Sequence, residues 1–88
     1  MERKTLETGR VVKSIAGRDC GYFMVVLNQE SDYVFVADGK ERPLERPKRK
    51  NLKHLTKTNI VIDKQDMESN RKLRKALCNS INSLEEVK

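Results

Sequence analysis

The sequence has little of what disulfide-rich, zinc-binding and membrane proteins depend on. Its 88 residues include two cysteines and one histidine, too few for a disulfide framework or for the four protein ligands of a structural zinc site. No run approaches the roughly 20 apolar residues that a spanning helix needs, and the polar start MERKTLETGR lacks the apolar core of a signal peptide. We therefore expect a cytoplasmic protein that makes no use of a membrane. In that compartment Cys20 and Cys78 are expected to stay reduced.

The usual signs of catalysis are also missing. A catalytic nucleophile needs a base within reach, and the only histidine, His54, lies in a run of cations that disfavours its protonated form. There is no Walker pattern that cradles phosphate and no carboxylate cluster with metal-ligand spacing. A chain this short also leaves little room for an enclosed substrate pocket. We expect no enzymatic activity, no metal and no cofactor.

Positive charge is abundant but confined to one segment. The chain has 19 Lys and Arg against 13 Asp and Glu, a net charge of +6. From Lys40 to Lys57, eight basic residues face two acidic ones, so the net charge of this segment, 8 − 2, already equals +6. A charge run is most often a solvated face, but this concentration between nearly neutral flanks favours a polyanionic partner. Composition alone does not separate RNA from DNA or from an acidic membrane surface.

The hydrophobic pattern divides the chain into a polar lead-in over residues 1–8, a mainly β part over 9–63 and a helical part over 64–88. Runs of apolar and β-branched residues bounded by turn residues predict strands. These cover residues 10–16, 22–27, 33–37, 40–44 and 60–62. The six successive apolar residues of 22–27 are typical of a strand covered on both faces.

Glycine marks two of the predicted connections. Gly17 and Gly21 frame a loop, and as glycines they allow positive φ and permit a close backbone approach. Asp38-Gly39 is a strong signal for a two-residue hairpin turn, which would pair residues 40–44 with 33–37. Two leucines three apart, Leu52 and Leu55, favour a single helical turn within residues 48–55.

The helical part carries one apolar stripe. Leu73, Leu77, Ile81 and Leu84 recur at helical spacing, which predicts an amphipathic helix over about 66–85. We expect the stripe to pack on the outer faces of the second and third strands. The alternative is that the stripe pairs with a protein partner or with a second copy of the chain. We therefore expect either a monomer, with the stripe on its own sheet, or a weak homodimer.

Two runs of residues resemble a known family. The run GRVVKSIAGRDCG, from Gly9 to Gly21, resembles the KOW motif, a module of ribosomal proteins and transcription elongation factors built on an SH3-like barrel. The run RPKRKNLKHL, from Arg46 to Leu55, is similar to the basic run that ends the barrel in the archaeal and eukaryotic large-subunit ribosomal family numbered fourteen. The resemblance covers about residues 9–57 and implies a mainly β fold, a small SH3-like (KOW) barrel of about five strands with a C-terminal α-helix. The chain is shorter than that family, which favours a small ribosome-associated protein over a permanent ribosomal subunit.

The resemblance implies a non-catalytic RNA-binding protein. Its expected partners are RNA, ribosomal RNA above all, and ribosomal proteins. The surface that binds the RNA is expected to consist of the glycine loop and the basic segment. The residues implied for that surface are Lys13, Gly17, Arg18, Lys48, Arg49, Lys50, Asn51, Lys53 and His54; the basic segment adds Arg46. Lys and Arg suit phosphate oxygens, and about four to six such contacts give a slope of log K against log salt of roughly −3 to −5. The alternative function is a protein-interaction adaptor that uses the barrel and the helix stripe.

Several of these residues have a structural reading as well. His54 is as suited to capping the turn or packing on the barrel as to stacking on a base. Asp19 is expected to fix its loop by accepting backbone N–H bonds. The four aromatic residues, Tyr22, Phe23, Tyr33 and Phe35, are expected in the core. The exception that we expect to stack on a base is Tyr22 or Tyr33.

Overall fold

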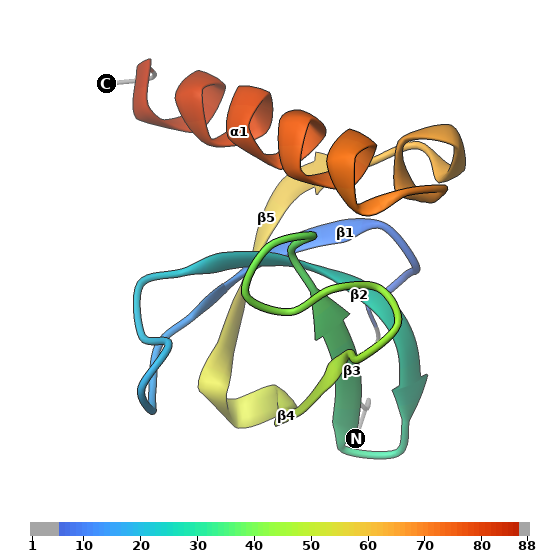
Figure 1. Ribbon diagram of the computed structural model, residues 1–88. Coiled ribbons are helices and arrows are strands. Elements are labelled where there is room, and N and C mark those ends of the chain that lie inside the picture. The colour runs from blue at the N-terminus through green and yellow to red at the C-terminus, as the bar shows by residue number, and fades with distance from the viewer. Residues whose placement is uncertain (1–5, 87–88) are drawn as a thin grey trace.

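The computed structural model describes the backbone of residues 6–86 and the side chains of residues 6–82 (Figure 1). Five antiparallel strands form one curled sheet in the order β4-β3-β2-β1-β5, and a single α-helix follows. The strands are β1 (Arg10–Ser14), β2 (Phe23–Glu30), β3 (Tyr33–Ala37), β4 (Lys48–Asn51) and β5 (Leu55–Val61). Two short 3-10 helices, η1 (Leu52–His54) and η2 (Lys64–Met67), precede α1 (Asn70–Glu86). The predicted fold, a small barrel-like β structure with a C-terminal helix, is confirmed.

The core has two layers because successive strand residues point to opposite faces of the sheet. Val12 and Val26 belong to the cluster inside the curl of the sheet, whereas Val11 and Val25 belong to the cluster between the sheet and α1. All four side chains are fully buried. This explains the unbroken apolar run at the start of β2: both of its faces are covered, as its sequence predicts.

Helix α1 supplies the outer layer and lies across the sheet (Figure 1). Its Leu73 and Leu77 are buried against Val11, Val25 and Ala37, which come from β1, β2 and β3. Leu73 and Leu77 of the stripe therefore pack on the sheet of the same chain, as expected, although the contact includes β1 as well as the second and third strands. The side chain of Leu84 lies outside the described residues. No helix among residues 6–86 has the length and apolarity that a membrane span requires.

The predicted strand over residues 40–44 is wrong. These residues form a turn in which the Asp38 carboxylate accepts backbone N–H bonds from Lys40 and Arg42, both at 2.8 Å. Gly39 has φ +81°, and a Cβ there would lie 2.4 Å from the Asn70 carbonyl oxygen. The Asp-Gly pair thus seats the start of α1 closely against the turn and does not make a hairpin.

The strand that pairs with β3 lies further along the chain. This strand is β4, in which Arg49 lies opposite Phe35 of β3. Residues 48–51, predicted as part of a helical turn, are therefore extended, and only Leu52–His54 is helical, as η1. The last strand is also longer than predicted, Leu55–Val61, because Thr56 and Lys57 pair with β1.

Candidate nucleic-acid interface

The loop between β1 and β2, residues 15–22, is built around a buried carboxylate. Asp19 is 9% exposed and accepts hydrogen bonds from Ser14 Oγ at 2.9 Å, Lys50 Nζ at 2.9 Å and Lys48 Nζ at 3.2 Å. Lys50 Nζ also donates to the Ala16 carbonyl at 3.2 Å. The predicted partners of Asp19, backbone N–H groups, are wrong: its carboxylate binds side-chain donors from β1 and β4.

Electrostatics keep this carboxylate ionised. Burial raises the pKa of Asp19, but hydrogen bonds from Lys50, Ser14 and Lys48 outweigh that effect and hold the pKa well below its usual range. The hydrogen bonds between this carboxylate and the two ammonium groups are strong, because charge-assisted hydrogen bonds are stronger than neutral ones. We call Asp19 and its three partners, Ser14, Lys48 and Lys50, the Asp19 cluster. This cluster joins the loop to β4.

Two glycines give the loop its shape. Gly17 and Gly21 have φ values of +88° and +93°, and Gly21 N donates to the Ser14 carbonyl at 2.7 Å. A Cβ on Gly21 would meet nothing within 4 Å, so the backbone at this corner is open to solvent. Both glycines use the positive φ that their lack of a side chain allows, and Gly21 leaves room for a ligand to approach the backbone.

The loop also contacts η1. Ile15 N donates to the His54 carbonyl at 2.8 Å, and Asn51 caps η1 by accepting the Lys53 N–H bond at 2.9 Å. Residues 15–22 and 48–54 thus meet at one end of the barrel. We call these two segments the cationic end.

The predicted site residues differ in what they present at this surface. Arg18, Arg49, Lys53 and His54 are exposed. Lys48 is half-buried and bound to Asp19, and Lys50 is buried at 6% exposure with its ammonium group bound inside the protein. We therefore revise the place of Lys50: its side chain holds the cationic end together and is not presented at the surface.

Four predicted residues remain, and Asn51 caps η1 as described above. Lys13 lies on the outer face of β1 with Nζ 5.6 Å from the centre of the Phe23 ring. Arg46 is exposed in a turn, where its N–H bonds to the Pro43 carbonyl at 2.9 Å. No hydrogen bond or ion pair within residues 6–82 joins either side chain to the cationic end. Gly17 lies in the loop itself, as described above.

The aromatic residues are less buried than expected. Tyr22 and Tyr33 are 54% and 37% exposed, whereas Phe23 packs partly buried against the outer cluster. The Arg49 guanidinium lies 4.3 Å from the centre of the Tyr33 ring, within range for a cation–π contact. Both tyrosines therefore present ring surface to solvent.

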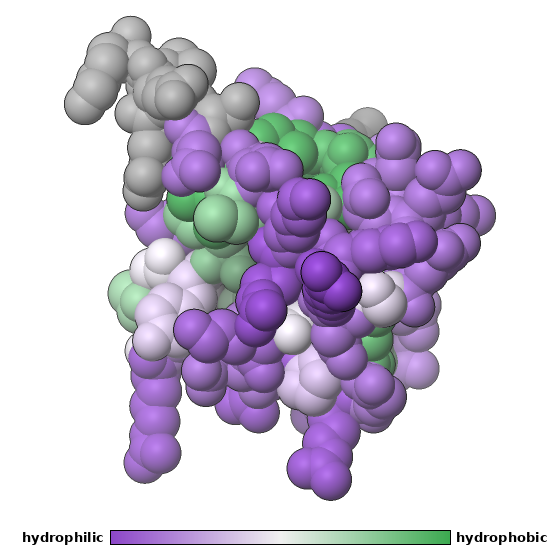
Figure 2. Space-filling view, turned by 45° about the horizontal axis from the view of Figure 1, so that its top comes forward, coloured by the Kyte–Doolittle hydropathy of each residue, from purple (hydrophilic) through white to green (hydrophobic). Residues whose placement is uncertain are grey.

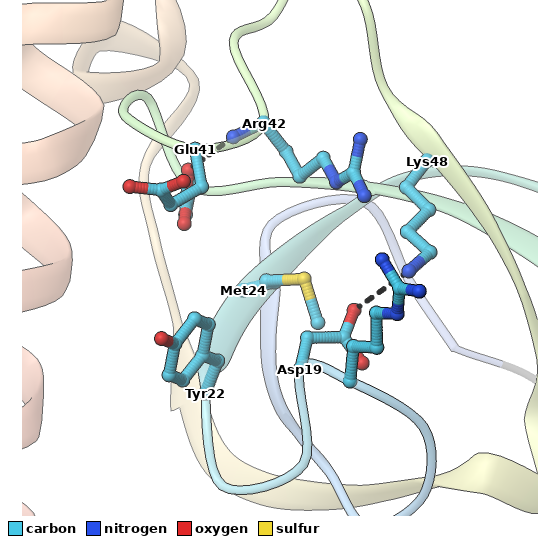
Figure 3. A pocket seen from close by; sticks show the side chains of 8 residues that line it. Asp19, Tyr22, Met24, Glu41, Arg42 and Lys48 are labelled. Atoms are coloured by element: carbon cyan, nitrogen blue, oxygen red, sulfur yellow. Dashed lines mark hydrogen bonds and ion pairs between the residues drawn. The ribbon is translucent and has the colours of Figure 1, made fainter.

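A pocket of about 270 Å³ opens beside the cationic end (Figure 3). It lies between the loop 15–22 and the turn 38–42, with the side chain of Met24 between its two sides. The eight lining residues are Arg18, Asp19, Tyr22, Met24, Asp38, Glu41, Arg42 and Lys48. Sequence reasoning missed the contribution of Glu41 and Arg42, because reading 40–44 as a paired strand placed them away from the loop.

Helix α1 carries a second group of cations. Arg71, Arg74 and Lys75 are exposed, and none of them has an ion-pair partner within residues 6–82. Lys72 differs, because its Nζ lies 3.3 Å from a Glu68 carboxylate oxygen. Hydrophilic side chains cover most of the face shown in Figure 2, with apolar surface in limited areas. The pattern that places these cations off the apolar stripe is visible in the sequence, but it is typical of any solvated helix face.

The described residues offer no metal centre. Among residues 6–82, no group of three or more His, Cys, Asp or Glu side chains is placed to hold a metal ion. Cys20 and Cys78 are free and exposed.

The geometry so far defines a small β-barrel whose β1–β2 loop is joined by ion pairs to a cationic strand. Comparison with protein-family models and with curated proteins finds no match to this chain.

Proposed function

We propose that this chain is a non-catalytic RNA-binding protein that holds the sugar-phosphate backbone of structured RNA, ribosomal RNA in the first place, on its cationic end. The observation that carries the proposal is the Asp19 cluster. It fixes the loop 15–22 against β4, so that Arg18 from the loop and Arg49 from the strand project from a preformed surface. A preformed site loses less conformational entropy when it binds.

The chemistry of the exposed groups suits phosphate. Arg18 and Arg49 present planar guanidinium groups that bind phosphate oxygens in bidentate fashion, and Lys53 adds a point charge. The open backbone at Gly21 permits a close approach by a sugar-phosphate chain. A-form RNA has a major groove too narrow for side chains, so such a surface reads backbone shape and unpaired segments.

The resemblance of residues 9–57 to the KOW module agrees with this proposal. The matched positions include Gly17 and Arg18 in the loop and the run from Lys48 to His54, which are the two segments of the cationic end. We therefore propose a KOW-type ribosome-associated protein. On this proposal Lys48 and Lys50 act by holding the loop, while Arg18, Arg49 and Lys53 contact the RNA.

The adaptor alternative rested on two features, the ability of SH3-like barrels to bind proteins and the apolar stripe of the helix. Leu73 and Leu77 of that stripe are buried against the sheet of the same chain. These two leucines complete the core and are not available to a partner without unfolding that layer.

The test compares two triple charge reversals with the wild type. Arg18→Glu/Arg49→Glu/Lys53→Glu removes exposed cations of the cationic end, whereas Lys64→Glu/Arg71→Glu/Lys75→Glu makes the same change in net charge elsewhere. Binding to ribosomal RNA fragments is measured by fluorescence anisotropy between about 50 and 200 mM salt. We expect the first variant to bind at least about tenfold more weakly and to show a shallower salt slope, by about 0.7 to 0.9 for each phosphate that it no longer neutralises.

The control variant distinguishes a site from bulk charge. If both triple variants weaken binding equally, net charge alone explains it and the cationic end is not the site. Equal binding by the wild type and the first variant also contradicts the proposal. Lys48 and Lys50 are left intact in both variants, because their substitution would disturb the Asp19 cluster.

A further inference from the structure

The pocket beside the cationic end combines three kinds of group that recognise a nucleotide: an aromatic ring, a carboxylate and cationic side chains. The loop 15–22 contributes Tyr22, 54% exposed, and Asp19; the turn 38–42 contributes Glu41 and Arg42, and β4 contributes Lys48 (Figure 3). Its volume of about 270 Å³ is slightly below the roughly 300–1,000 Å³ of small-ligand sites. Exposed side chains of the loop 15–22 and of the turn 38–42 border the pocket, so it is open to solvent.

The groups in this pocket divide into those that hold the protein together and those that are free. Asp19 is bound to Lys48 and Lys50, and Asp38 accepts two backbone N–H bonds. By contrast, the side chains of Arg18, Glu41 and Arg42 make no hydrogen bond or ion pair with any residue in the described part of the chain. The pocket therefore keeps one carboxylate and two guanidinium groups available for a ligand.

We propose that this pocket binds one unpaired guanine base of the RNA, with a neighbouring phosphate on the pocket's cations. The inference rests on the proposed RNA-binding function and adds to it a base preference. The base lies over Met24 against the Tyr22 ring, because unpaired bases are commonly bound by stacking on aromatic side chains.

The free carboxylate selects the base. Ionised Glu41 only accepts hydrogen bonds, and its two oxygens match two adjacent donors. Guanine alone among the four bases presents adjacent donors on its Watson–Crick edge, N1–H and the N2 amino group; uracil presents a single N–H between two carbonyl oxygens. Guanine O6 and N7 are in turn the acceptors that arginine prefers. Arg42 follows Glu41 in the same turn, and its side chain extends away from Glu41 toward Lys48 (Figure 3).

The test uses nonamer RNAs that differ at one position. A fluorescent nonamer with eight uridines carries guanosine, inosine or uridine at its centre, and free GMP and UMP serve as competitors. The variants are Glu41→Gln and Tyr22→Ala, with Tyr22→Phe as the conservative replacement. The charge-matched control is Glu30→Gln, an exposed carboxylate at the end of β2.

We expect the guanosine nonamer to bind about tenfold more tightly than the all-uridine nonamer, as one or two hydrogen bonds to a charged group imply. Inosine, which lacks the N2 amino group, falls between them. Glu41→Gln removes the preference, so that its guanosine and all-uridine nonamers bind equally, and Glu30→Gln keeps the preference of the wild type. Tyr22→Ala weakens binding of the guanosine nonamer about tenfold, whereas Tyr22→Phe retains it.

The outcomes separate this inference from the proposed function. Equal binding of all three nonamers, or a preference that survives in Glu41→Gln, overturns the guanine pocket while salt-dependent binding through Arg49 and Lys53 still stands. If free GMP competes as tightly as the guanosine nonamer, the pocket binds a free nucleotide, and the proposal that the base belongs to RNA is contradicted. A protein that binds none of the nonamers at about 50 mM salt overturns the proposed function together with the pocket.

Discussion

Replacing Asp19 by asparagine should destabilise the protein by about 3 kcal/mol, because the change leaves two ammonium groups without their counter-charge. Breaking a fully buried ion pair costs roughly 3–5 kcal/mol. The low end applies here, because Lys48 is 30% exposed and Lys50 keeps its bond to the Ala16 carbonyl. The loss is a large share of the roughly 5–15 kcal/mol that stabilises a typical domain.

Urea unfolding followed by circular dichroism measures this loss directly. The midpoint should fall while the slope m stays constant, because the surface exposed on unfolding does not change. At roughly 4–8 °C per kcal/mol for a domain of this size, Tm should fall by about 12–24 °C. Glu68→Gln is the control, because it breaks an exposed ion pair with Lys72 at 3.3 Å and should cost less than about 0.5 kcal/mol.

A second substitution tests the cause. In Asp19→Asn/Lys50→Met the buried ammonium group is gone, so the double variant should be more stable than Asp19→Asn alone. If Asp19→Asn is no more destabilising than Glu68→Gln, the Asp19 cluster does not hold the loop. The cationic end would then have no structural basis as a preformed surface.

Three further predictions concern the same buried contacts. The pKa of Asp19 is lowered in the folded protein, so its stabilisation is present above about pH 4 and is lost as the pH falls through the folded value; acid titration of stability should show this loss in the wild type and not in Asp19→Asn. Gly39→Ala should cost about 3 kcal/mol in urea unfolding, because a Cβ would lie 2.4 Å from the Asn70 carbonyl at φ +81°, whereas Gly21→Ala, at φ +93° with open space, should cost about 1 kcal/mol; equal costs would contradict the close seat of α1. Leu73→Ala should cost about 2–5 kcal/mol by the same measurement, and a loss under about 0.5 kcal/mol would mean that α1 does not pack on the sheet.

The binary pattern was enough to predict most of the fold. The β-branched and aromatic run in residues 33–37 and the unbroken apolar run in 22–27 predicted strands that the structure contains. That unbroken run also indicated a covered outer face, and the spacing of Leu73 and Leu77 supplied the helix that covers it. These features are local in sequence and strong in hydrophobic contrast, which is why they are readable without coordinates.

The fourth strand was missed because its local signals disagree. The spacing of Leu52 and Leu55 favoured helix, and Asp38-Gly39 favoured a hairpin that would have used residues 40–44. The side chains of Lys48 and Lys50 both reach Asp19, which the period of two in a strand explains, while Arg49 points outward. The alternation therefore separates structural from exposed cations, but only once the segment is known to be a strand.

The Asp19 cluster was beyond the sequence for a different reason. Asp19 and Lys50 lie 31 residues apart, and their contact depends on the pairing of β4 with β3 and on the curl of the sheet. The pocket between the loop 15–22 and the turn 38–42 depends on the same long-range arrangement. The glycines marked where the backbone turns, but nothing local showed what the turns bring together.

The most direct test of the central claim is an NMR titration of the isotope-labelled protein with a ribosomal RNA fragment, following every backbone amide. If the cationic end binds RNA, the largest shift changes fall on residues 15–22 and 48–54, and they shrink as salt is raised. Changes confined to the exposed face of α1 around Arg71 and Lys75, or no changes at low salt, would contradict it.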